Sequence, residues 1–283
     1  MGNVREACAR RTRQCDAMIG MPRLSIIIVS YNARADLERC LASLVTDAPA
    51  IDHEIIVVDN ASADDTVQTL RSRWAGIRLI EAGANLGFSR ANNIGIRQSF
   101  GDLVLLLNGD TVVPPGAIDA LVAAIDRRPD VGVVGPRLVD ADGKAELSFG
   151  RMISPWNEVR QKLRARGNVE GLTSREREVD WVSGACLLVR RADAEAVGLL
   201  DERYFLYTED VDFCAAIRAR GRRILFTPTA QIVHLRGRSR QTAPGPSERA
   251  YRRSHIAFYE KHHPRWAPWL RVYLRLRGRL PDR

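Results

Sequence analysis

The stretch Leu103-Val-Leu-Leu-Leu-Asn-Gly-Asp-Thr111 places five apolar residues directly before an amide, a glycine and a carboxylate. A short run of this kind is typical of a parallel strand that is buried on both faces. Ligands of open α/β sheets bind just beyond the carboxyl ends of the strands, so Asn108 and Asp110 are expected in a cleft. A carboxylate beside a glycine suits a divalent cation that carries a diphosphate. The alternative is a simple turn, because Asn-Gly and Gly-Asp are common turn pairs.

The chain before this stretch alternates short apolar runs with segments of helical periodicity. Strands are expected at residues 24–30, 54–59 and 77–81. Helices are expected where Leu37, Cys40, Leu41 and Leu44 recur at helical spacing and again around residues 67–73. A β-α-β-α-β order predicts an α/β fold with a parallel sheet and right-handed crossovers.

A segment rich in glycine and amide residues, 83–95, follows the third strand and becomes helical up to Phe100. Ser89 is expected to cap this helix, and a helix N-terminus favours an anion such as phosphate. The segment contains neither Gly-Lys-Ser/Thr nor a Gly-x-Gly-x-x-Gly fingerprint, so it matches no common nucleotide loop. A plain strand-to-helix connection is the alternative.

The second half of the chain continues the alternation after the opening stretch. Pro114 and Pro115 are expected to start a helix whose inner face carries Ile118, Leu121, Val122 and Ile125. Further elements are expected as a strand at 131–135, a variable polar excursion at 140–178, a strand at 181–190, a helix at 192–197, and short strands at 224–226 and 231–233.

A group of carboxylates, Glu209, Asp210 and Asp212, opens a helix directly after the aromatic side chains of Tyr204, Phe205 and Tyr207. The helix dipole accounts for one or two acids at this position, and a third exceeds what capping requires. A carboxylate in a partly apolar wall can have a raised pKa and act as a general base. The strand that ends at His234 delivers this side chain into a basic, glycine-containing loop, where it is either a metal ligand or a structural histidine.

The charge of the chain is concentrated in its last part. Residues 235–283 carry 13 Lys+Arg and 3 Asp+Glu, which leaves 30 and 31 of the totals of 43 and 34 for residues 1–234. A protein that binds nucleic acid through its fold would carry the basic excess on its body, so this class is disfavoured. The chain has five cysteines, an odd number, and their spacing is not that of a metal site. Unpaired thiols of this kind suit a reduced, cytoplasmic setting. The longest apolar runs fall short of a membrane span.

The termini differ from the body between them. Residues 1–22 form an N-terminal extension that is either disordered or absent if Met21 is the start, and they lack the apolar core of a secretory signal. Residues 240–283 form a basic tail with a short linker and two helical stretches. The last stretch carries Trp266, Trp269, Leu270, Tyr273 and Leu274 among arginines. Such a helix suits an anionic membrane surface, and docking back on the domain is the alternative.

The motifs in their order resemble the family 2 glycosyltransferases of the GT-A fold, and among them bacterial rhamnosyltransferase-like enzymes. The resemblance covers roughly residues 23–262 and implies an α/β fold with a mixed, mostly parallel sheet flanked by helices. Residues 23–239 are expected to be the catalytic domain. Each motif is weak alone, whereas the ordered series is specific. The series is Val29-Ser-Tyr-Asn32, Val57-Val-Asp-Asn-Ala-Ser62, Asn85-Leu-Gly-Phe88 with Ala91-Asn-Asn93, Leu107-Asn-Gly-Asp-Thr111, Val182-Ser-Gly-Ala185, Tyr207-Thr-Glu-Asp-Val-Asp212 and His234-x-x-Gly-x-Ser239.

The resemblance implies a role for each group of candidate residues. Asp210 would be the catalytic base with Glu209 beside it, and Asp110 and His234 would hold Mn²⁺ or Mg²⁺. The acceptor side would include Trp181, Gly184 and Asp212. The nucleotide-sugar would contact Ser30, Tyr31, Asn32, Asp59, Asn85, Gly87, Arg90, Asn92, Asn108 and Gly109. Asn108 replaces the first acid of the family's Asp-x-Asp motif, and Gly109 stands where proline is usual.

These roles predict a metal-assisted, inverting single displacement, because an acceptor hydroxyl needs a base and a diphosphate leaving group needs charge neutralisation. The donor implied is dTDP-L-rhamnose, and the acceptor a lipid-linked or cell-surface glycan precursor on the inner face of the cytoplasmic membrane. A UDP-sugar donor, such as UDP-galactofuranose or a UDP-hexosamine, is the alternative within the same mechanism.

Two other classes of protein were considered. A nucleotidyltransferase lacks support because the loop after the first strand carries no glycine-rich pyrophosphate motif, and a non-catalytic binding module is the remaining class. The oligomeric state stays open.

Overall fold

The computed structural model describes residues 21–157, 169–235 and 244–281. The expected N-terminal extension therefore lies outside the described residues up to residue 20, as do the loop after His234 and the start of the linker in the tail.

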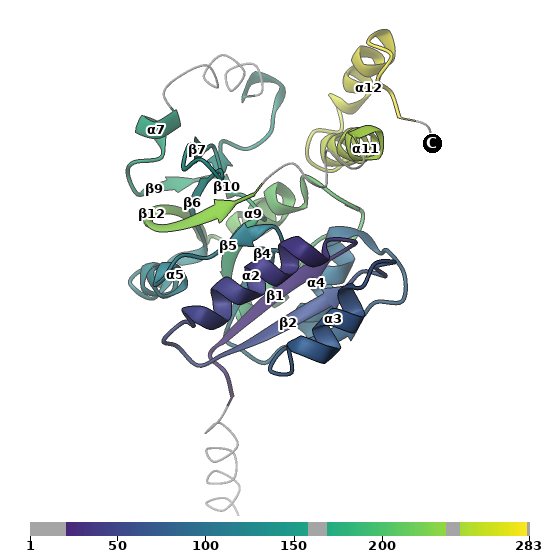
Figure 1. Ribbon diagram of the computed structural model, residues 1–283. Coiled ribbons are helices and arrows are strands. Elements are labelled where there is room, and N and C mark those ends of the chain that lie inside the picture. Colours follow the sequence, from purple (N-terminus) through teal and green to yellow (C-terminus); the bar gives the residue numbers. More distant parts are fainter. Residues whose placement is uncertain (1–20, 158–168, 236–243, 282–283) are drawn as a thin grey trace, which may run out of the picture.

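Ten of the strands in the described part of the chain form one sheet, in the order β3-β2-β1-β4-β11-β6-β12-β5, with β7 beside β6 and β9 beside β12 (Figure 1). The first four strands pair in parallel, as predicted. β11 runs antiparallel to both β4 and β6, so β6 and the β12 strand beside it point in the same direction as the first four. The reversed strands are thus β11 and the short edge strands β5, β7 and β9. The expected mixed, mostly parallel sheet is confirmed.

The strands of the main sheet follow the apolar runs of the sequence. Their bounds are β1 Leu24–Ser30, β2 His53–Asp59, β3 Arg78–Glu81, β4 Leu103–Asn108, β5 Thr111–Val112, β6 Val131–Val139, β7 Ala145–Glu146, β9 Arg177–Val179, β11 Cys186–Arg190 and β12 Arg223–His234. A separate pair is formed by β8 (Phe149–Gly150) and β10 (Trp181–Val182). The excursion at 140–178 thus contains short strands, and its residues 158–168 lie outside the described part.

Helices cover both faces of the sheet because successive strand residues point to opposite faces. Ile26 and Ile28 of β1 belong to one buried cluster with side chains of α2 and α5, whereas Ile27 belongs to a second buried cluster with side chains of α4 and α9. The helix bounds are α2 Arg34–Thr46, α3 Thr66–Arg73, α4 Gly87–Gln98, α5 Ala117–Asp126, α7 Val169–Leu172, α8 Arg191–Ala196, α9 Glu209–Ala219, α11 Pro244–His262 and α12 Ala267–Leu276. Among the described residues, no helix combines the length and the apolar content needed to cross a membrane.

Three local predictions were wrong. The strand expected at 181–190 is broken into β10 and β11, because the backbone N–H of Gly184 turns to the side chain of Asp210. The two short strands expected after residue 223 are one strand, β12, with an irregularity between Thr227 and Gln231. Ser89 is a buried residue inside the first turn of α4, which starts two residues earlier, so it does not cap that helix.

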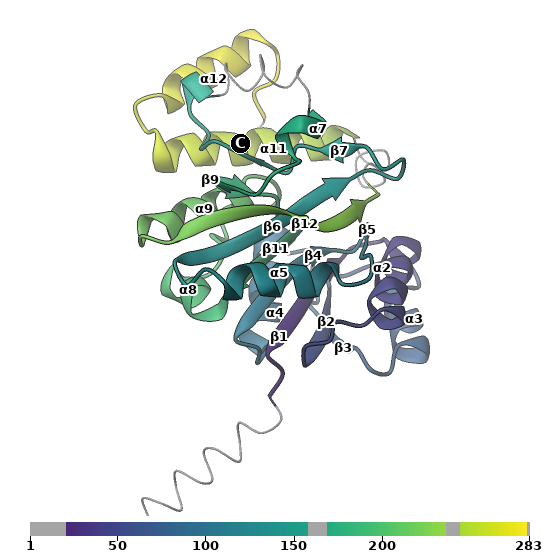
Figure 2. The ribbon, with the colours of Figure 1, turned by 90° about the vertical axis from the view of Figure 1, so that its left-hand side faces the viewer.

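The two tail helices lie together at one end of the molecule (Figures 1 and 2). Both views place them opposite the end where the chain enters β1, and therefore beyond the carboxyl ends of the parallel strands. α11 packs against the body through a small cluster of buried side chains. The members of that cluster are Tyr204, Val211, Phe258, Tyr259 and Ala267.

Candidate active site

The carboxyl ends of β1, β2 and β4 meet at one edge of the sheet. The strand register pairs Ser30 with Asp59 and Val29 with Asn108, so the polar residues that end these strands are neighbours. The sequence pattern alone predicted this edge as the site, because polar residues directly follow buried strands there.

Asp59 is the most informative residue of the nucleotide side. Its side chain is buried, and Oδ2 accepts a hydrogen bond from the backbone N–H of Ser62 at 3.0 Å. Its other oxygen, Oδ1, has no hydrogen-bond partner within the described part of the chain, and neither has the buried hydroxyl of Ser30. A buried acceptor without a donor is unfavourable, so this pair of atoms is suited to receive polar groups of a ligand.

The loops around Asp59 are held by side-chain hydrogen bonds. Asn32 has a left-handed backbone with φ 50°, and its Oδ1 accepts from the backbone N–H of Ala63 at 2.6 Å. Its own N–H donates to the hydroxyl of Ser62 at 2.9 Å. Tyr31 beside it is about half exposed, with a relative accessibility of 49%, so its ring is free to lie against a base.

Asn60 is a residue that the sequence predictions missed. Its Nδ2 donates to Asn85 Oδ1 at 2.9 Å, and its Oδ1 accepts from the backbone N–H of Leu86 at 2.8 Å. The end of β2 is thereby tied to the start of α4, whose first N–H groups are capped by amide side chains. The sequence signal was the amide directly after Asp59 at the end of a buried strand, because a polar side chain at such a position needs a hydrogen-bond partner.

Gly87 permits a close contact between the two halves of the site. It has φ +80°, and a Cβ atom built on it would lie 2.4 Å from the carbonyl oxygen of Phe205. That oxygen accepts from the backbone N–H of Phe88 at 2.7 Å. Only glycine fits here, so the loop that precedes the carboxylates packs directly on the N-terminus of α4.

Arg90 and Asn92 lie on α4, and both side chains contact other protein groups in this structure. Arg90 pairs with Glu202 at 3.2 Å, and the amide of Asn92 donates to the carbonyl of Phe88 within its own helix. Their expected contact with a nucleotide-sugar stays a prediction.

Asp110 and His234 come together from distant parts of the sequence. β12 pairs with β5 so that His234 lies opposite Thr111, and the backbone N–H of Leu235 donates to the carbonyl of Asp110 at 2.8 Å. His234 Nε2 is 3.3 Å from Asp110 Oδ1. Bonds of about 2.1 Å at right angles would hold two ligand atoms about 3 Å apart, so this pair fits one small divalent cation.

The donor set of this pair is one carboxylate oxygen and one imidazole nitrogen, which suits Mg²⁺ or Mn²⁺ when phosphate and water complete the shell. No group of three or more His, Cys, Asp and Glu side chains within the described ranges could hold a metal by itself. Gly109, between Asn108 and Asp110, has room for a Cβ atom, whose nearest neighbours would be 3.7 Å away. Crowding therefore does not explain why glycine stands here where the family usually has proline.

Glu146 is a second residue that the sequence did not reveal. It lies on β7, and its Oε2 is 3.4 Å from His234 Nδ1, on the side of the ring away from Asp110. A carboxylate on the second nitrogen fixes the orientation and tautomer of a metal-binding imidazole. Glu146 lies inside the excursion of weak periodicity, where the sequence offers no signal for it.

Glu209 and Asp210 are neighbours at the start of α9, where Glu209 is buried and Asp210 is partly buried. Asp210 Oδ2 accepts from the backbone N–H of Gly184 at 2.9 Å, and Oδ1 accepts from that of Val211 at 2.8 Å. Burial raises the pKa of Asp210, while these two hydrogen bonds oppose that effect by stabilising the carboxylate. Burial and then the charge of Asp210 raise the pKa of Glu209 well above its ordinary value. Glu209 Oε2 has no partner among the described residues, so Asp210 is the better ionised base.

The backbone that leads into this pair is strained. Tyr207 and Thr208 both have positive φ, at 72° and 64°, although neither is glycine. Each such residue costs roughly 1–3 kcal/mol and persists only where surrounding structure enforces it. The ring of Tyr207 contacts the ring of Tyr251 on α11, with centroids 6.0 Å apart.

Asp212 does not fit the acceptor contact that was expected of it. It is 1% exposed, and its Oδ1 lies 2.6 Å from His262 Nε2 and accepts from the hydroxyl of Tyr204 at 3.2 Å. Its Oδ2 accepts from Lys261 Nζ at 2.8 Å. Both oxygens are engaged by residues of α11 and by Tyr204, so Asp212 joins α11 to α9.

The other two acceptor-side candidates, Gly184 and Trp181, come from neighbouring parts of the chain. A Cβ atom on Gly184 would be 3.3 Å from Asp210 Cβ, which places this glycine against the carboxylate. Trp181 is partly buried, and its Nε1 donates to the carbonyl of Arg151 at 2.9 Å. Their contact with an acceptor remains a prediction.

Comparison with known proteins gives a consistent result. The family model "Glycosyl transferase family 2" matches residues 25–198. The N-acetylglucosaminyl-diphospho-decaprenol L-rhamnosyltransferase of Mycobacterium tuberculosis is 34% identical over 91% of this chain and 92% of its own length. The dTDP-rhamnosyl transferase RfbF of Shigella flexneri is 27% identical over 75% of this chain and 68% of its own length.

Two solved structures share the fold. GalNAc-T7 with UDP, GalNAc and Mn²⁺ superposes with a TM-score of 0.62 and 18% identity, over 84% of this chain and about half, 48%, of that chain. The mannosyltransferase PcManGT from Pyrobaculum calidifontis, in complex with GDP-Man and Mn²⁺, gives a TM-score of 0.61 and 20% identity, over 89% of this chain and 68% of that chain.

Proposed function

We propose, because this chain belongs to glycosyl transferase family 2 and has the GT-A fold, that it transfers L-rhamnose from dTDP-L-rhamnose to a hydroxyl of a lipid-linked or cell-surface glycan precursor. The chain is a glycosyltransferase. The choice of donor and acceptor is supported by similarity over nearly the full length to the mycobacterial enzyme, whose name specifies an L-rhamnosyl group and a diphospho-decaprenol acceptor.

The observation that carries the proposal is the meeting of Asp110 with His234, 3.3 Å apart, at the strand edge that also presents Asp59. A divalent cation held by Asp110 and His234 would supply Lewis-acid stabilisation to the departing diphosphate. Solved structures of the fold with Mn²⁺ support such a cation for the family.

The remaining steps are assigned to residues of this chain. Asp59 Oδ1 accepts the N3–H of the pyrimidine base, and Tyr31 lies against the ring. The N-terminus of α4 faces the diphosphate, where the helix dipole favours negative charge. Asp210 removes the proton of the acceptor hydroxyl as that oxygen attacks the anomeric carbon from the face opposite the diphosphate, which inverts the configuration.

A UDP-sugar donor, such as UDP-galactofuranose or a UDP-hexosamine, is the second candidate, because uracil and thymine present the same N3–H to Asp59. A non-catalytic nucleotide-sugar-binding module is disfavoured, since Glu209, Asp210 and His234 are all present. We place the reaction in the cytoplasm, where nucleotide-sugars and the inner leaflet are both accessible.

The test is a donor panel with the purified chain, Mn²⁺ or Mg²⁺, and a polyprenyl diphosphate-linked GlcNAc acceptor. Transfer from dTDP-L-rhamnose, with stereochemistry inverted at the anomeric carbon, is the expected result. Transfer from a UDP-sugar instead would keep the mechanism and overturn the donor. The Asp210→Asn variant controls for contaminating activity, and transfer by that variant at the wild-type rate would overturn the assigned mechanism.

A further inference from the structure

We propose that the outer face of α12 is the surface by which this chain binds an anionic phospholipid bilayer. The proposal rests on the proposed function, because a lipid-linked acceptor requires the enzyme to work at a membrane. Its partner is the surface of the bilayer, not the acceptor.

α12 carries two apolar faces, and the body of the protein covers one of them. Leu274 and Ala267 are 1% and 5% exposed, and Ala267 packs with the buried cluster of α11. The other face is open, with exposures of 68% at Trp269, 51% at Val272, 49% at Tyr273 and 83% at Leu276. These four positions follow the i, i+3, i+4, i+7 spacing of a single helix face.

Trp266, at the N-cap of α12, extends this face with an exposure of 46%. Tryptophan and tyrosine are favoured at the boundary between lipid and water, because each has an apolar ring and a polar group. A short helix of this kind lies in the interface instead of crossing the bilayer.

The charge around this face complements an anionic surface. Residues 263–281 contain five arginines, at 265, 271, 275, 277 and 279, and no acidic residue. Arg271 pairs with Glu260, and the guanidinium of Arg277 lies over the ring of Tyr273 at 5.6 Å. Each arginine near an anionic leaflet adds to the attraction, so aromatic anchors and cations act together.

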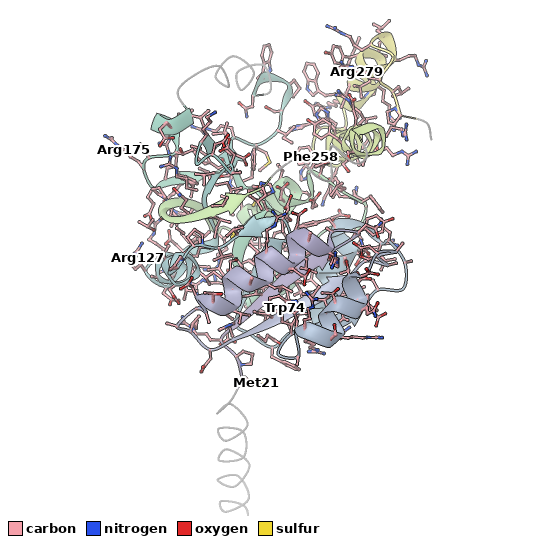
Figure 3. All side chains as sticks on the ribbon, viewed as in Figure 1. Met21, Trp74, Arg127, Arg175, Phe258 and Arg279 are labelled. Carbon is pink, nitrogen blue, oxygen red and sulfur yellow. The ribbon has the colours of Figure 1, made fainter. Side chains whose placement is uncertain are left out.

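The position of α12 suits the reaction. Figures 1 and 2 place it on the far side of α11 from the sheet, beyond the carboxyl ends of the strands where the site lies. Figure 3 shows Phe258 where α11 meets the body and Arg279 at the outer end of the tail, whereas Met21 lies at the opposite end. A bilayer on this face would present a lipid-linked acceptor from the side of Asp210.

Other occupants of this face are less suited. A second copy would bring two arginine-rich faces together, and their repulsion opposes a dimer. Nucleic acid would engage the arginines and leave the central tryptophan and leucine side chains without an apolar partner.

The experiment measures binding of the full chain to vesicles, without donor or acceptor, by co-sedimentation. Vesicles of phosphatidylcholine alone are compared with vesicles that contain 30% phosphatidylglycerol, roughly the anionic content that gives a strong surface potential, at low and high salt. Two tail variants are tested: Trp269→Ser with Leu276→Ser, and Arg275→Gln with Arg279→Gln. The matched controls are Val45→Ser and Arg175→Gln, because both side chains are exposed outside the tail.

We expect binding only to the anionic vesicles, weakened by salt, and reduced about 30-fold when two arginines are lost. The control variants should bind like the wild type. Release of nucleotide diphosphate by donor hydrolysis should be unchanged in the tail variants, so failure of this proposal is separable from failure of the proposed function. Equal binding to both vesicle types, retained binding by the tail variants, a dimer that these substitutions dissociate, or binding to RNA in place of vesicles would each overturn the proposal.

Discussion

Replacing Asp59 with asparagine tests the nucleotide pocket at a single atom. In the wild type, Oδ2 accepts from the N–H of Ser62 and Oδ1 is without a partner among the described residues. Asparagine has the same shape but only one acceptor oxygen. If that oxygen faces Ser62, the NH₂ group opposes the N3–H of the base; if the amide is flipped, NH₂ opposes the N–H of Ser62. Either orientation leaves two donors facing each other.

The expected loss follows from the bond that disappears. A hydrogen bond to a charged group contributes about 1.5–3 kcal/mol, so dTDP should bind roughly 10- to 150-fold more weakly to Asp59→Asn. Stability of the free protein should change little, because the substitution also removes a buried charge without a partner on one side.

Isothermal titration calorimetry with dTDP measures the affinity, and thermal melting reports whether the fold is intact. Asp119→Asn is the matched control, because its carboxylate also accepts a backbone N–H, that of Ala50 at 3.0 Å, on another part of the surface. A folded Asp59→Asn variant that binds dTDP within twofold of the wild type would refute the role of Oδ1.

Three further outcomes follow from the geometry. Asp210→Asn should lower the transfer rate at least 100-fold while dTDP affinity stays within about twofold, as measured by initial rates and calorimetry, and a parallel loss of binding would contradict its role as base. Glu146→Gln should weaken Mn²⁺ binding in the presence of dTDP by about 10- to 100-fold, measured by electron paramagnetic resonance of free Mn²⁺; unchanged affinity would mean that Glu146 does not position His234. Because burial raises the pKa of Glu209, the folded chain holds this proton more tightly than the unfolded chain, and stability should decline as pH rises from about 4.3 through the raised pKa. The Glu209→Gln variant should therefore have a higher melting temperature than the wild type at pH 8, and this difference should disappear below pH 4. Equal melting temperatures of the two proteins at pH 8 and below pH 4 would show that Glu209 is not buried in ionised form.

The strands and the site edge were predictable because their causes are local. Leu103–Asn108 and Leu24–Ser30 are apolar over almost their whole length, and the polar residues that stop them must lie at the sheet edge. The meeting of Asp110 with His234 was implied by resemblance only, because the two residues are 124 positions apart in the sequence and no periodicity connects them. The motifs at strand ends therefore allowed site residues to be predicted. The polar excursion at 140–178 did not, and Glu146 was missed there.

The errors had causes outside the segment in which they occurred. The apolar pattern of residues 181–190 is that of one strand, but the N–H of Gly184 donates to Asp210 and breaks it. Ser89 has the residue type of a cap, yet Asn60 and Asn85 already satisfy the N–H groups at that helix start. In both cases a side chain from a distant segment outcompeted the local preference.

The role of α11 shows why the tail belongs with the site. The left-handed residues Tyr207 and Thr208 need external support, since each costs roughly 1–3 kcal/mol. The contacts that hold this loop come from α11: Ser254 donates to the carbonyl of Leu206 at 2.8 Å, and Lys261 bonds to Asp212. A helix about 50 residues downstream thus contacts both sides of the strained turn before α9. The amphipathic pattern of the tail could not predict these contacts. Such a pattern indicates that one face of a helix is buried, but not which segment of the chain covers that face.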